Sequence, residues 1–549
     1  MSEKLFRVLL VSDFNIQNLA ALMIQDKSSP SLEVDTANYS GGVIAPAGVD
    51  LGVSWTMPEN VIPGFKRILN FESVSDEEIL ADVDNYFKNI ERFFVNTPLV
   101  FLPLWQRTSS ARFFAVQESK SLTGAARALA LMNLRLMKNA ENSSRMIVLD
   151  SDPWFRGDAD AFNPKLWYMG KIAFGREVFS RASHQFKATL RNIYGQSKKL
   201  ILVDLDDTLW GGLVGEEGWE NLKLGGHDPL GEAFADFQKA LKAMTKRGIL
   251  IGIISKNNET TALDAISRHP EMALKISDFS GWKINWNDKS DNIKQIAAEL
   301  KLGLDSVVFI DDSPVERSRV KEALPEVFVP DWPEDKMLYK NALLSLDCFD
   351  AVHVNAEDKN RIAMYRSEKD RVDLKKDTAS YGDWLKGLDM TVHAEALTRS
   401  NLPRAAQLLN KTNQMNLSTR RLSEEELFNW ASYPEHLFFT FRVSDKFGDS
   451  GLTGLVSLKK EAKAGRIIDF VLSCRVLGRG VEEMMLNYVS TFAIKNNLNK
   501  LIVEYRATLK NSPCLDFFNK SRFLATEKNH IFYWELKSAY PAPPEIRLE

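Results

Sequence analysis

The chain has 549 residues, a length that predicts about three or four domains at roughly 150 residues each. Its hydrophobic content of 44% and charged content of 26% are typical of folded soluble proteins, which excludes wholesale disorder, collagen and coiled-coil arrays. With 70 Lys and Arg against 73 Asp and Glu, the formal charge of −3 gives no reason to expect a nucleic-acid partner.

The cysteine content and the apolar runs indicate the compartment. Three cysteines are too few for a disulfide framework and favour a reducing environment: Cys348, Cys474 and Cys514. The N-terminal residues lack the apolar core and the cleavage site of a signal peptide. No run approaches the roughly 20 apolar residues that span a bilayer. We therefore expect a cytoplasmic protein with no membrane partner, and the oligomeric state stays open.

The first region, residues 1–195, alternates apolar runs with helical patterns. FRVLLV (6–11), VNTPLVFLPLW and SRMIVLD read as buried parallel strands, which are continuous apolar runs. Helical patterns cover DFNIQNLAALMIQ, residues 76–92 and residues 122–138. This alternation predicts an α/β domain.

The second region, residues 199–345, gives three clear strands. They are LILVDL (200–205), ILIGIIS (249–255) and SVVFIDD (306–312), and each ends in polar residues. An amphipathic helix over 231–247 ends at Gly248, and Ser290 is the expected N-cap of a helix over DNIKQIAAEL. In open α/β sheets the functional crevice lies at the carboxyl ends of the strands.

The remaining regions are a connector and a third domain. Residues 346–384 are highly charged, and we expect them to form a helical connector. Residues 385–540 begin with helices and continue with strands over 438–443, 451–459 and 467–472 that can form an antiparallel sheet. RVLGRGVEEMM then indicates a glycine-rich loop that enters a helix.

The strongest chemical signal is DLDDT, Asp204 to Thr208, directly after an apolar strand. The first and third side chains of D-x-D point the same way from an extended backbone. Asp204 and Asp206 can therefore converge on one Mg²⁺ or one phosphoryl group, and an Asp can form an aspartyl-phosphate. Alone, the pattern could equally be a solvated turn.

Three further features favour the functional interpretation. Ser255 ends the second strand, where its hydroxyl can donate to a phosphoryl oxygen. Lys289 stands just before a helix N-terminus, a position that suits an anion. Asp311 and Asp312 end the third strand and can complete a metal shell.

In this order, the residues resemble the haloacid dehalogenase (HAD) superfamily of phosphotransferases over about residues 200–330. The resemblance implies that Asp204 is the nucleophile and that Asp206 is the general acid and base. It matches Ser255 and Lys289 to the second and third motifs, with Lys283 as a weaker match to the third. Mg²⁺ would be held by Asp204, the Asp206 main-chain carbonyl, and Asp311 or Asp312. Further candidates for binding phosphate or substrate are Thr208, Lys256 and Asn257.

The short spacings between these motifs leave no room for a large cap domain, so we expect an open site for a bulky or macromolecular substrate. A closer resemblance is to the FkbH-like family, HAD proteins of subfamily IIIC found in secondary-metabolite pathways. It is carried by DLDDTLWGGLVGEEG, ISKNNE, NWNDKSDNIKQIAAELKLGLDSVVFIDDSPVER and CRVLGRGVEEMM. The implied architecture is an α/β protein of three domains: a HAD-like Rossmann-type core between an SGNH-hydrolase-like α/β domain and an acetyltransferase-like (GNAT) α+β domain.

The FkbH-like resemblance also implies an activity. A glyceryl group moves from 1,3-bisphosphoglycerate to an enzyme cysteine and then to the phosphopantetheine thiol of an acyl carrier protein. The sequence departs from this pattern, because Ile254 stands where such members carry the cysteine before the second-motif serine. Cys474 or Cys514 could supply a thiol only if the third domain folds over the site.

The flanking domains carry weaker signals. In the GNAT-like domain, the resemblance implies that coenzyme A or a phosphopantetheine arm binds at Arg475, Gly478, Arg479 and Gly480, where a glycine-rich turn also has an ordinary structural explanation. Nothing singles out an acetylation base. The remaining candidates there are Glu504, Tyr505, Asn413, Arg420 and Arg421.

In the first domain, Ser12 and Asp13 follow the first strand, where an SGNH enzyme carries its nucleophile. His184 is the only nearby histidine, and a lone histidine on a helix is more often structural. We expect a structural or docking domain there.

Three functions compete at this point. The leading hypothesis is a Mg²⁺-dependent HAD-type phosphatase or phosphotransferase in a biosynthetic pathway, acting on a phosphorylated metabolite or a carrier-linked acyl group through an aspartyl-phosphate on Asp204. The second is a glyceryl transferase and phosphatase that loads an acyl carrier protein. The third is a non-catalytic scaffold that binds a carrier protein.

Overall fold

The computed structural model describes most of the chain, and its contacts form two compact units. The described residues are 5–39, 44–107, 116–141, 143–158, 160–226, 228–350, 371, 374–375, 378, 380–508, 510–526 and 530–549. One unit comprises residues 1–191 with 422–429, and the other comprises 192–421 with 430–549. Most of the connector expected to be helical, 346–384, lies outside the described residues.

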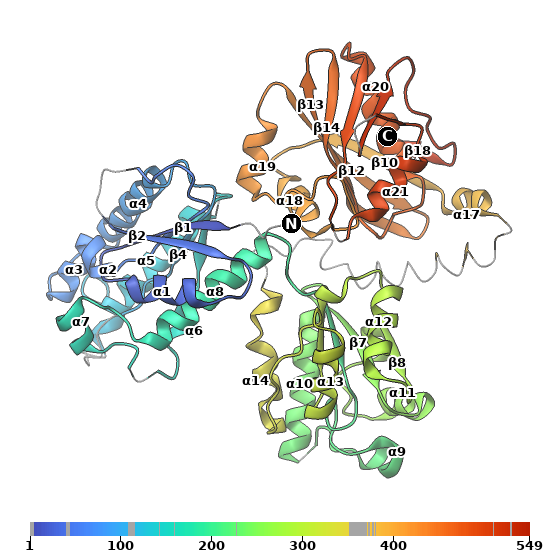
Figure 1. The fold of residues 1–549 in the computed structure, drawn as a ribbon. Helices are drawn as coiled ribbons and strands as arrows, with labels where there is room; N and C mark the ends of the chain where they lie inside the picture. The colour runs from blue at the N-terminus through green and yellow to red at the C-terminus, as the bar shows by residue number, and fades with distance from the viewer. Residues whose placement is uncertain are drawn as a thin grey trace. The chain divides into compact units, whose positions relative to one another are not determined.

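The first unit is built on a five-stranded parallel sheet with strand order β2-β1-β3-β4-β5 (Figure 1). The strands are β1 (Phe6–Ser12), β2 (Leu32–Asn38), β3 (Leu51–Ser54), β4 (Val100–Pro103) and β5 (Met146–Leu149). The longer helices are α1 (Gln17–Gln25), α4 (Asp76–Phe93), α5 (Ala125–Ala140) and α8 (Arg176–Ile193). Edge strand β2 has no fully buried residue, so it lacks the apolar run by which a buried strand is recognised.

The second unit contains the sheet that carries the candidate site. Its four strands are all parallel, in the order β8-β7-β6-β9. They are β6 (Leu200–Val203), β7 (Leu250–Ser255), β8 (Gly281–Ile284) and β9 (Val307–Ile310). Alternate residues of β6 enter two different cores, Ile201 and Val203 on one face and Leu200 and Leu202 on the other. Both faces are therefore covered, which explains why every residue of this strand is apolar.

The helices around the middle sheet position its loops. The longer ones are α10 (Pro229–Thr245), α11 (Glu259–Arg268), α12 (Lys289–Glu299) and α13 (Pro314–Ala323), and the short ones include α9 (Val214–Glu217) and α14 (Tyr339–Leu344). Helix α12 does not start at the predicted cap. Asp288, rather than Ser290, is the N-cap, and its carboxylate accepts a hydrogen bond from the Ser290 amide. Lys289 is consequently the first residue of the helix.

The same unit also contains a mixed sheet of nine strands. The order is β16-β17-β15-β14-β13-β12-β10-β18, and β11 pairs with β14. The strands are β10 (Met390–Ala396), β11 (Met415–Asn416), β12 (His436–Asp445), β13 (Gly448–Glu461), β14 (Ala464–Leu472), β15 (Lys500–Glu504), β16 (Leu524–Ala525), β17 (Ile531–Glu535) and β18 (Ile546–Leu548). Strands β12, β13 and β14 pair antiparallel as expected, and helix α20 (Val481–Lys495) follows the glycine-rich loop. The described helices include none that is long and apolar enough to cross a bilayer.

A buried glutamine links the loop after β6 to the rest of the middle domain through hydrogen bonds. Gln238 of α10 is fully buried, and its amide donates a hydrogen bond to the Leu209 carbonyl at 2.8 Å. Its side-chain oxygen accepts from the Ala273 and Leu274 amides at 3.0 and 3.3 Å. One side chain therefore satisfies three backbone groups, one of which lies directly beside the DLDDT segment.

We predict that Gln238→Leu destabilises this unit by about 2 to 4 kcal/mol, because leucine leaves buried backbone groups without their partners. Urea unfolding followed by tryptophan fluorescence would measure the loss. Lys239→Ala, at the exposed neighbouring position, is the matched control. Equal unfolding midpoints for the two variants would contradict the role assigned to Gln238.

Candidate active site

The register of the middle sheet brings the strand-end acids together. Strands β6 and β9 are parallel neighbours with Val203 opposite Ile310, so the next residues, Asp204 and Asp311, leave the sheet side by side. The Asp204 amide also donates to the Ile310 carbonyl at 3.0 Å. The order β7-β6-β9 places Asp204 between the Ser255 and Asp311 strand ends.

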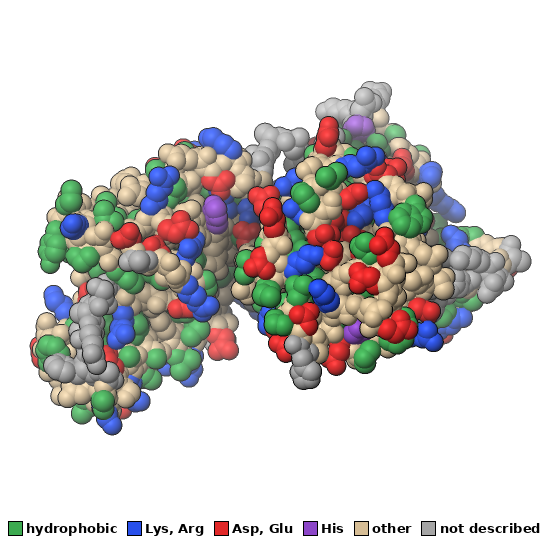
Figure 2. Space-filling model, turned by 90° about the horizontal axis from the view of Figure 1, so that it is seen from below, with side chains coloured by type: hydrophobic (Ala, Val, Ile, Leu, Met, Phe, Trp, Pro, Cys, Tyr) green, Lys and Arg blue, Asp and Glu red, His purple; other side chains and the backbone are tan. Residues whose placement is uncertain are grey.

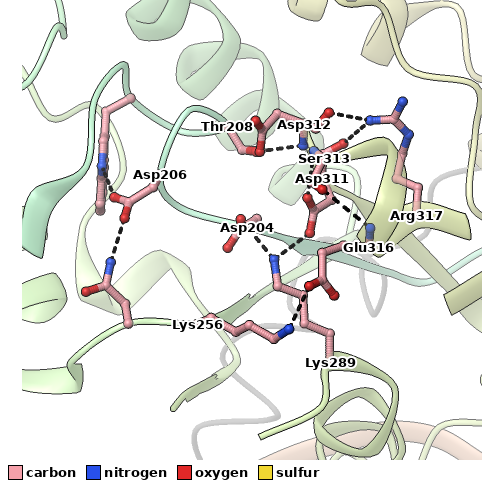
Figure 3. A network of polar contacts seen from close by, with 12 residues as sticks. Asp204, Asp206, Thr208, Lys256, Lys289, Asp311, Asp312, Ser313, Glu316 and Arg317 are labelled. Atoms are coloured by element: carbon pink, nitrogen blue, oxygen red, sulfur yellow. Dashed lines mark hydrogen bonds and ion pairs between the residues drawn. The ribbon is translucent and has the colours of Figure 1, made fainter. Parts of the chain in front are cut away.

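Lys289 joins the two acids. Its Nζ lies 2.9 Å from Asp204 Oδ2 and 2.6 Å from Asp311 Oδ2 (Figure 3). All three side chains are buried. A lysine at the first position of α12, fixed by the Asp288 cap, therefore pairs with carboxylates from two different strands.

The pKa values of these groups reflect their close packing. Burial disfavours the charged form of Lys289, but the charges of Asp204 and Asp311 outweigh it and raise the lysine pKa above its usual range. Burial and the nearby Asp204 charge raise the pKa of Asp311 to about 6, against the opposing effect of Lys289. Two carboxylates with one ammonium between them thus repel one another in a site from which most water is excluded.

A third carboxylate completes a set of candidate metal ligands. Asp204, Asp311 and Asp312 each offer one oxygen, and these oxygens lie within 4.8 Å of one another. Asp204 Oδ1 is buried and has no hydrogen-bond partner. The Thr208 hydroxyl donates to Asp312 Oδ1 at 3.3 Å and accepts from its amide at 3.1 Å, which orients that residue.

These residues fit a hard divalent cation. Three carboxylates face one ammonium, which leaves an excess of negative charge, and an unpartnered carboxylate oxygen is available for coordination. Mg²⁺ prefers oxygen ligands of this kind. Asp204, Asp311 and Asp312 would hold the ion, and its charge would offset the charge of a phosphoryl group.

Asp206 lies differently from the sequence expectation. Its carboxylate does not converge with that of Asp204 but points away from it (Figure 3). Asp206 Oδ1 accepts from the Trp210 indole at 2.8 Å and the Val214 amide at 3.1 Å, and Oδ2 accepts from the Asn257 amide at 2.8 Å. Burial raises the pKa of Asp206, and the hydrogen bonds from Val214 and Trp210 partly oppose the rise. A D-x-D pattern fixes backbone direction but not the partners that select this rotamer.

The second-motif residues are divided between two tasks. Ser255 is buried at the end of β7. Asn257 binds Asp206, whereas Lys256 forms an ion pair of 2.6 Å with Glu316. Lys283, the weaker lysine candidate, pairs instead with Glu299 at 2.6 Å.

Two supporting residues were missed in the sequence analysis. Besides Glu316, Arg317 donates from Nη1 to the main-chain carbonyls of Asp311 and Asp312 at 2.7 and 2.6 Å. Both residues belong to the first turns of α13, directly after the paired aspartates. Their position shortly after the paired aspartates in DDSPVER is the feature of the sequence that could have indicated this supporting role.

All three cysteines are described, and none is placed to supply the thiol that the family cysteine would provide at position 254. Ile254 is buried within β7. Cys474 Sγ lies 3.4 Å from the Lys301 carbonyl, which precedes β9 and is therefore at the opposite edge of the sheet from Asp311. Cys514 is fully buried, and burial raises its thiol pKa to about 12. Cys348 follows α14 and packs against the middle core.

The first domain shows no assembled nucleophile at Ser12. The hydroxyl of Ser12 is buried and accepts a hydrogen bond from the Phe14 amide at 3.1 Å. Asp13 accepts from the Met57 amide at 3.0 Å, and burial raises its pKa. His184 is exposed on α8, and no hydrogen bond joins it to Ser12 among the described residues. These contacts agree with a structural interpretation of both residues.

The glycine-rich loop of the third domain is closed by its own helix. The Gly478 amide donates to Glu482 Oε1 at 2.6 Å, and the Tyr381 hydroxyl donates to the Gly478 carbonyl. Arg479 is buried, donates from Nη2 to the Arg475 carbonyl at 2.5 Å and lies 3.6 Å from Asp445. Gly480 follows at φ +82°. The Gly478 amide thus binds a carboxylate of α20, which would have to move for that amide to bind coenzyme A or a phosphopantetheine arm.

The other candidates of the third domain have internal partners. Arg420 forms an ion pair with buried Asp469, and Arg421 donates to the Leu409 carbonyl at 2.5 Å and to the Asn413 side chain. The Tyr505 hydroxyl donates to Asn511 at 2.8 Å, and Glu504 lies 3.5 Å from Arg466.

Comparison with solved structures identifies a similar protein. The N-terminal part of BF1531 from Bacteroides fragilis, which contains a phosphatase domain and was crystallised with Mg, matches with 26% identity and a TM-score of 0.57. The match covers 64% of this chain and 96% of that one. A multidomain α/β fold that includes a phosphatase-like domain is therefore shown.

Other matches concern about a quarter of the chain. Spermidine N-acetyltransferase SpeG from Vibrio cholerae (a mutant form) is 18% identical, covers 26% of this chain and 94% of its own, and has a TM-score of 0.21. The PaiA N-acetyltransferase from Thermoplasma acidophilum, solved with coenzyme A, is 15% identical, covers 26% of this chain and 98% of its own, and also has a TM-score of 0.21. Scores this low carry no argument about function. No protein-family model and no curated protein matches the sequence.

We predict that Mg²⁺ stabilises the protein and that Asp311→Asn removes most of this effect. A ligand at a hundredfold excess over its Kd contributes about 2.7 kcal/mol to the folded state. Thermal unfolding with and without Mg²⁺ would measure the shift in Tm. Asp291→Asn, an exposed acid on α12, should behave like the wild type. The same Tm shift in both variants would exclude Asp311 as a ligand.

A second prediction concerns Glu482, whose pKa is raised to about 7 by burial. The folded state binds this proton more tightly than the unfolded chain, so stability falls as pH rises from the ordinary glutamate pKa through about 7. Glu482→Gln keeps an acceptor for Gly478 and should be more stable than wild type by about 3 kcal/mol at pH 8. At pH 5 the two should be nearly equal. Denaturant unfolding across this range, with exposed Glu322→Gln as control, would test it, and a pH-independent difference would contradict the prediction.

Proposed function

We propose that this protein is a Mg²⁺-dependent phosphatase of the HAD type, in which Asp204 accepts the phosphoryl group. The observation that carries the proposal is the buried set of Asp204, Lys289 and Asp311, with Asp204 Oδ2 bound to the lysine and Oδ1 unpartnered. The similarity to the Mg-bound phosphatase-containing structure of BF1531 supports it.

Each side chain has a role in the proposed reaction. Asp204 forms a bond to phosphorus while the bond to the leaving oxygen breaks, and Asp206 gives its proton to that oxygen. Water then attacks phosphorus, Asp206 takes the water proton, and the bond to Asp204 breaks to release phosphate. A carboxyl group with a raised pKa suits this exchange of protons. Asp206 must first leave Trp210 and Asn257, because its present hydrogen bonds hold it away from Asp204.

Lys289 fixes the orientation of Asp204 through their ion pair. The ammonium lies 2.9 Å from Asp204 Oδ2 and leaves Oδ1, which has no hydrogen-bond partner, for the attack on phosphorus. Ser255 ends the neighbouring strand, where its hydroxyl can donate to a phosphoryl oxygen. A bound Mg²⁺ would supply charge compensation for that phosphoryl group.

We further propose that the substrate is a phosphorylated metabolite or a carrier-linked acyl phosphate in a biosynthetic pathway of the FkbH-like type. An acyl carrier protein is the partner suggested by that resemblance. Glyceryl transfer through an enzyme thioester is disfavoured, because Ile254 replaces the cysteine and Cys474 lies at the opposite edge of the sheet. A pure scaffold is also disfavoured, since it would not need three carboxylates gathered around a buried lysine.

The test is phosphate release from acyl phosphates, 1,3-bisphosphoglycerate and phosphomonoesters, with Mg²⁺ and with or without a pantetheinylated carrier protein. We predict that Asp204→Asn lowers turnover by about 10³-fold or more, which corresponds to about 4 kcal/mol of barrier. Circular dichroism would check that the fold is retained. Asp264→Asn, an exposed position on α11, is the control.

Undiminished release by Asp204→Asn would refute the proposal. Dependence of release on the carrier protein would identify the carrier-linked substrate, and release without it would favour the free metabolite.

A further inference from the structure

One tryptophan differs from all the others in its exposure. All twelve tryptophans of the chain are described, and Trp286, at 75% exposure, is the only exposed one. Tryptophan offers a large apolar area, so leaving it in water forgoes a favourable contact. A scattered exposed leucine needs no explanation, but a single exposed indole beside an active site does.

Trp286 belongs to a short loop tied to the candidate site at both ends. The Asn285 amide donates to the Ser255 carbonyl at 3.1 Å. Asn285 and Asn292 also exchange side-chain hydrogen bonds, the shorter at 2.9 Å. At the other end, Asp288 caps α12 directly before Lys289. Trp286 therefore lies in a loop that is held at both ends. Asn285 before it bonds to Ser255, and Lys289 after it forms an ion pair with Asp204.

Two neighbouring segments at the same edge, the loop after β6 and the start of α13 (Pro314–Ala323), also carry exposed apolar side chains. Leu213 follows β6 and Val315 follows β9, and both are exposed. Parallel strands place the loops after β6, β8 and β9 at one edge of the sheet, where Asp204 and Asp311 also lie. Figure 2 shows apolar side chains among acidic and basic ones on the face of this domain seen from below.

The site itself provides charged groups for phosphate but little apolar surface. The described segments between β6 and β8 form short helices and α10 and α11, and none of them builds a separate cap domain over the strand ends. The part of a substrate beyond its phosphoryl group therefore meets the residues of these loops. Trp286 is the largest apolar surface that they expose.

We infer that Trp286 is a specificity-determining residue that packs against the leaving group, and that the preferred substrates are phosphate esters or acyl phosphates with an apolar or aromatic leaving group. The inference rests on the proposed phosphatase function and adds the substrate class.

The experiment compares phenyl phosphate with glycerol 3-phosphate for wild type, Trp286→Ala and Trp286→Phe with Mg²⁺. Trp286→Ala should lower kcat/KM for phenyl phosphate by about tenfold, mainly through KM, the factor that 1.4 kcal/mol represents. Glycerol 3-phosphate should change by less than about twofold, and Trp286→Phe should retain most of the preference. Leu344→Ala, an exposed apolar position on α14, is the matched control.

Equal losses for both substrates would overturn the inference, because they would indicate that Trp286 only supports the loop before Lys289. No change for either substrate would also overturn it and would favour a macromolecular contact. If wild type hydrolyses neither ester, calorimetry with phenylphosphonate and methylphosphonate decides the inference separately from the proposed function. Tighter binding of phenylphosphonate that is lost in Trp286→Ala supports it, and equal or absent binding overturns it.

Discussion

The buried pairing of Lys289 with Asp204 and Asp311 is the interaction on which the rest of the site depends. Two ionised carboxylates from adjacent strands repel one another in a buried place, and the Lys289 ammonium between them offsets that repulsion. Removing one partner of such a buried pair costs about 3 to 5 kcal/mol, because the other charge remains uncompensated. The register of β6 with β9 brings the acids together, and the Asp288 cap sets where α12 begins and thus where the ammonium lies. The register of the sheet, the start of α12 and the charge balance of the site therefore depend on one another.

The middle domain differs from the other two domains in having this buried group of charges. In the first domain Ser12, the last residue of β1, accepts a hydrogen bond from the Phe14 amide. In the third domain the Gly478 amide donates a hydrogen bond to the Glu482 carboxylate. Other buried carboxylate oxygens without a hydrogen-bond partner occur among the described residues, Asp13 Oδ2 for example, but only Asp204 Oδ1 belongs to a group of three acids that could hold a metal ion. The capacity for phosphoryl chemistry is accordingly concentrated there.

Much of this arrangement was predictable from the sequence because parallel buried strands are continuous apolar runs, and residues at their carboxyl ends must meet at one edge. That argument predicts the proximity of Asp204 and Asp311 without coordinates. It does not predict the direction of Asp206, which depends on Trp210 and on Asn257 from the loop after β7. Nor does it distinguish Asp288 from Ser290 as the cap, since both are favourable residues two positions apart. Edge strand β2 was not predicted, because its residues are not fully buried. The closure of the glycine-rich loop was not predicted either, because it depends on the Glu482 side chain one helical turn after Gly478.

Asp204 is proposed to be a covalent phosphoryl acceptor, and the most direct measurement is to look for that bond. Wild-type protein with Mg²⁺ and an acyl phosphate would be quenched in acid during turnover and digested for peptide mass spectrometry. We predict a phosphoryl adduct on the peptide that contains Asp204, stable in acid and lost at alkaline pH. Turnover with no adduct on that peptide, or an adduct on another residue, would contradict it.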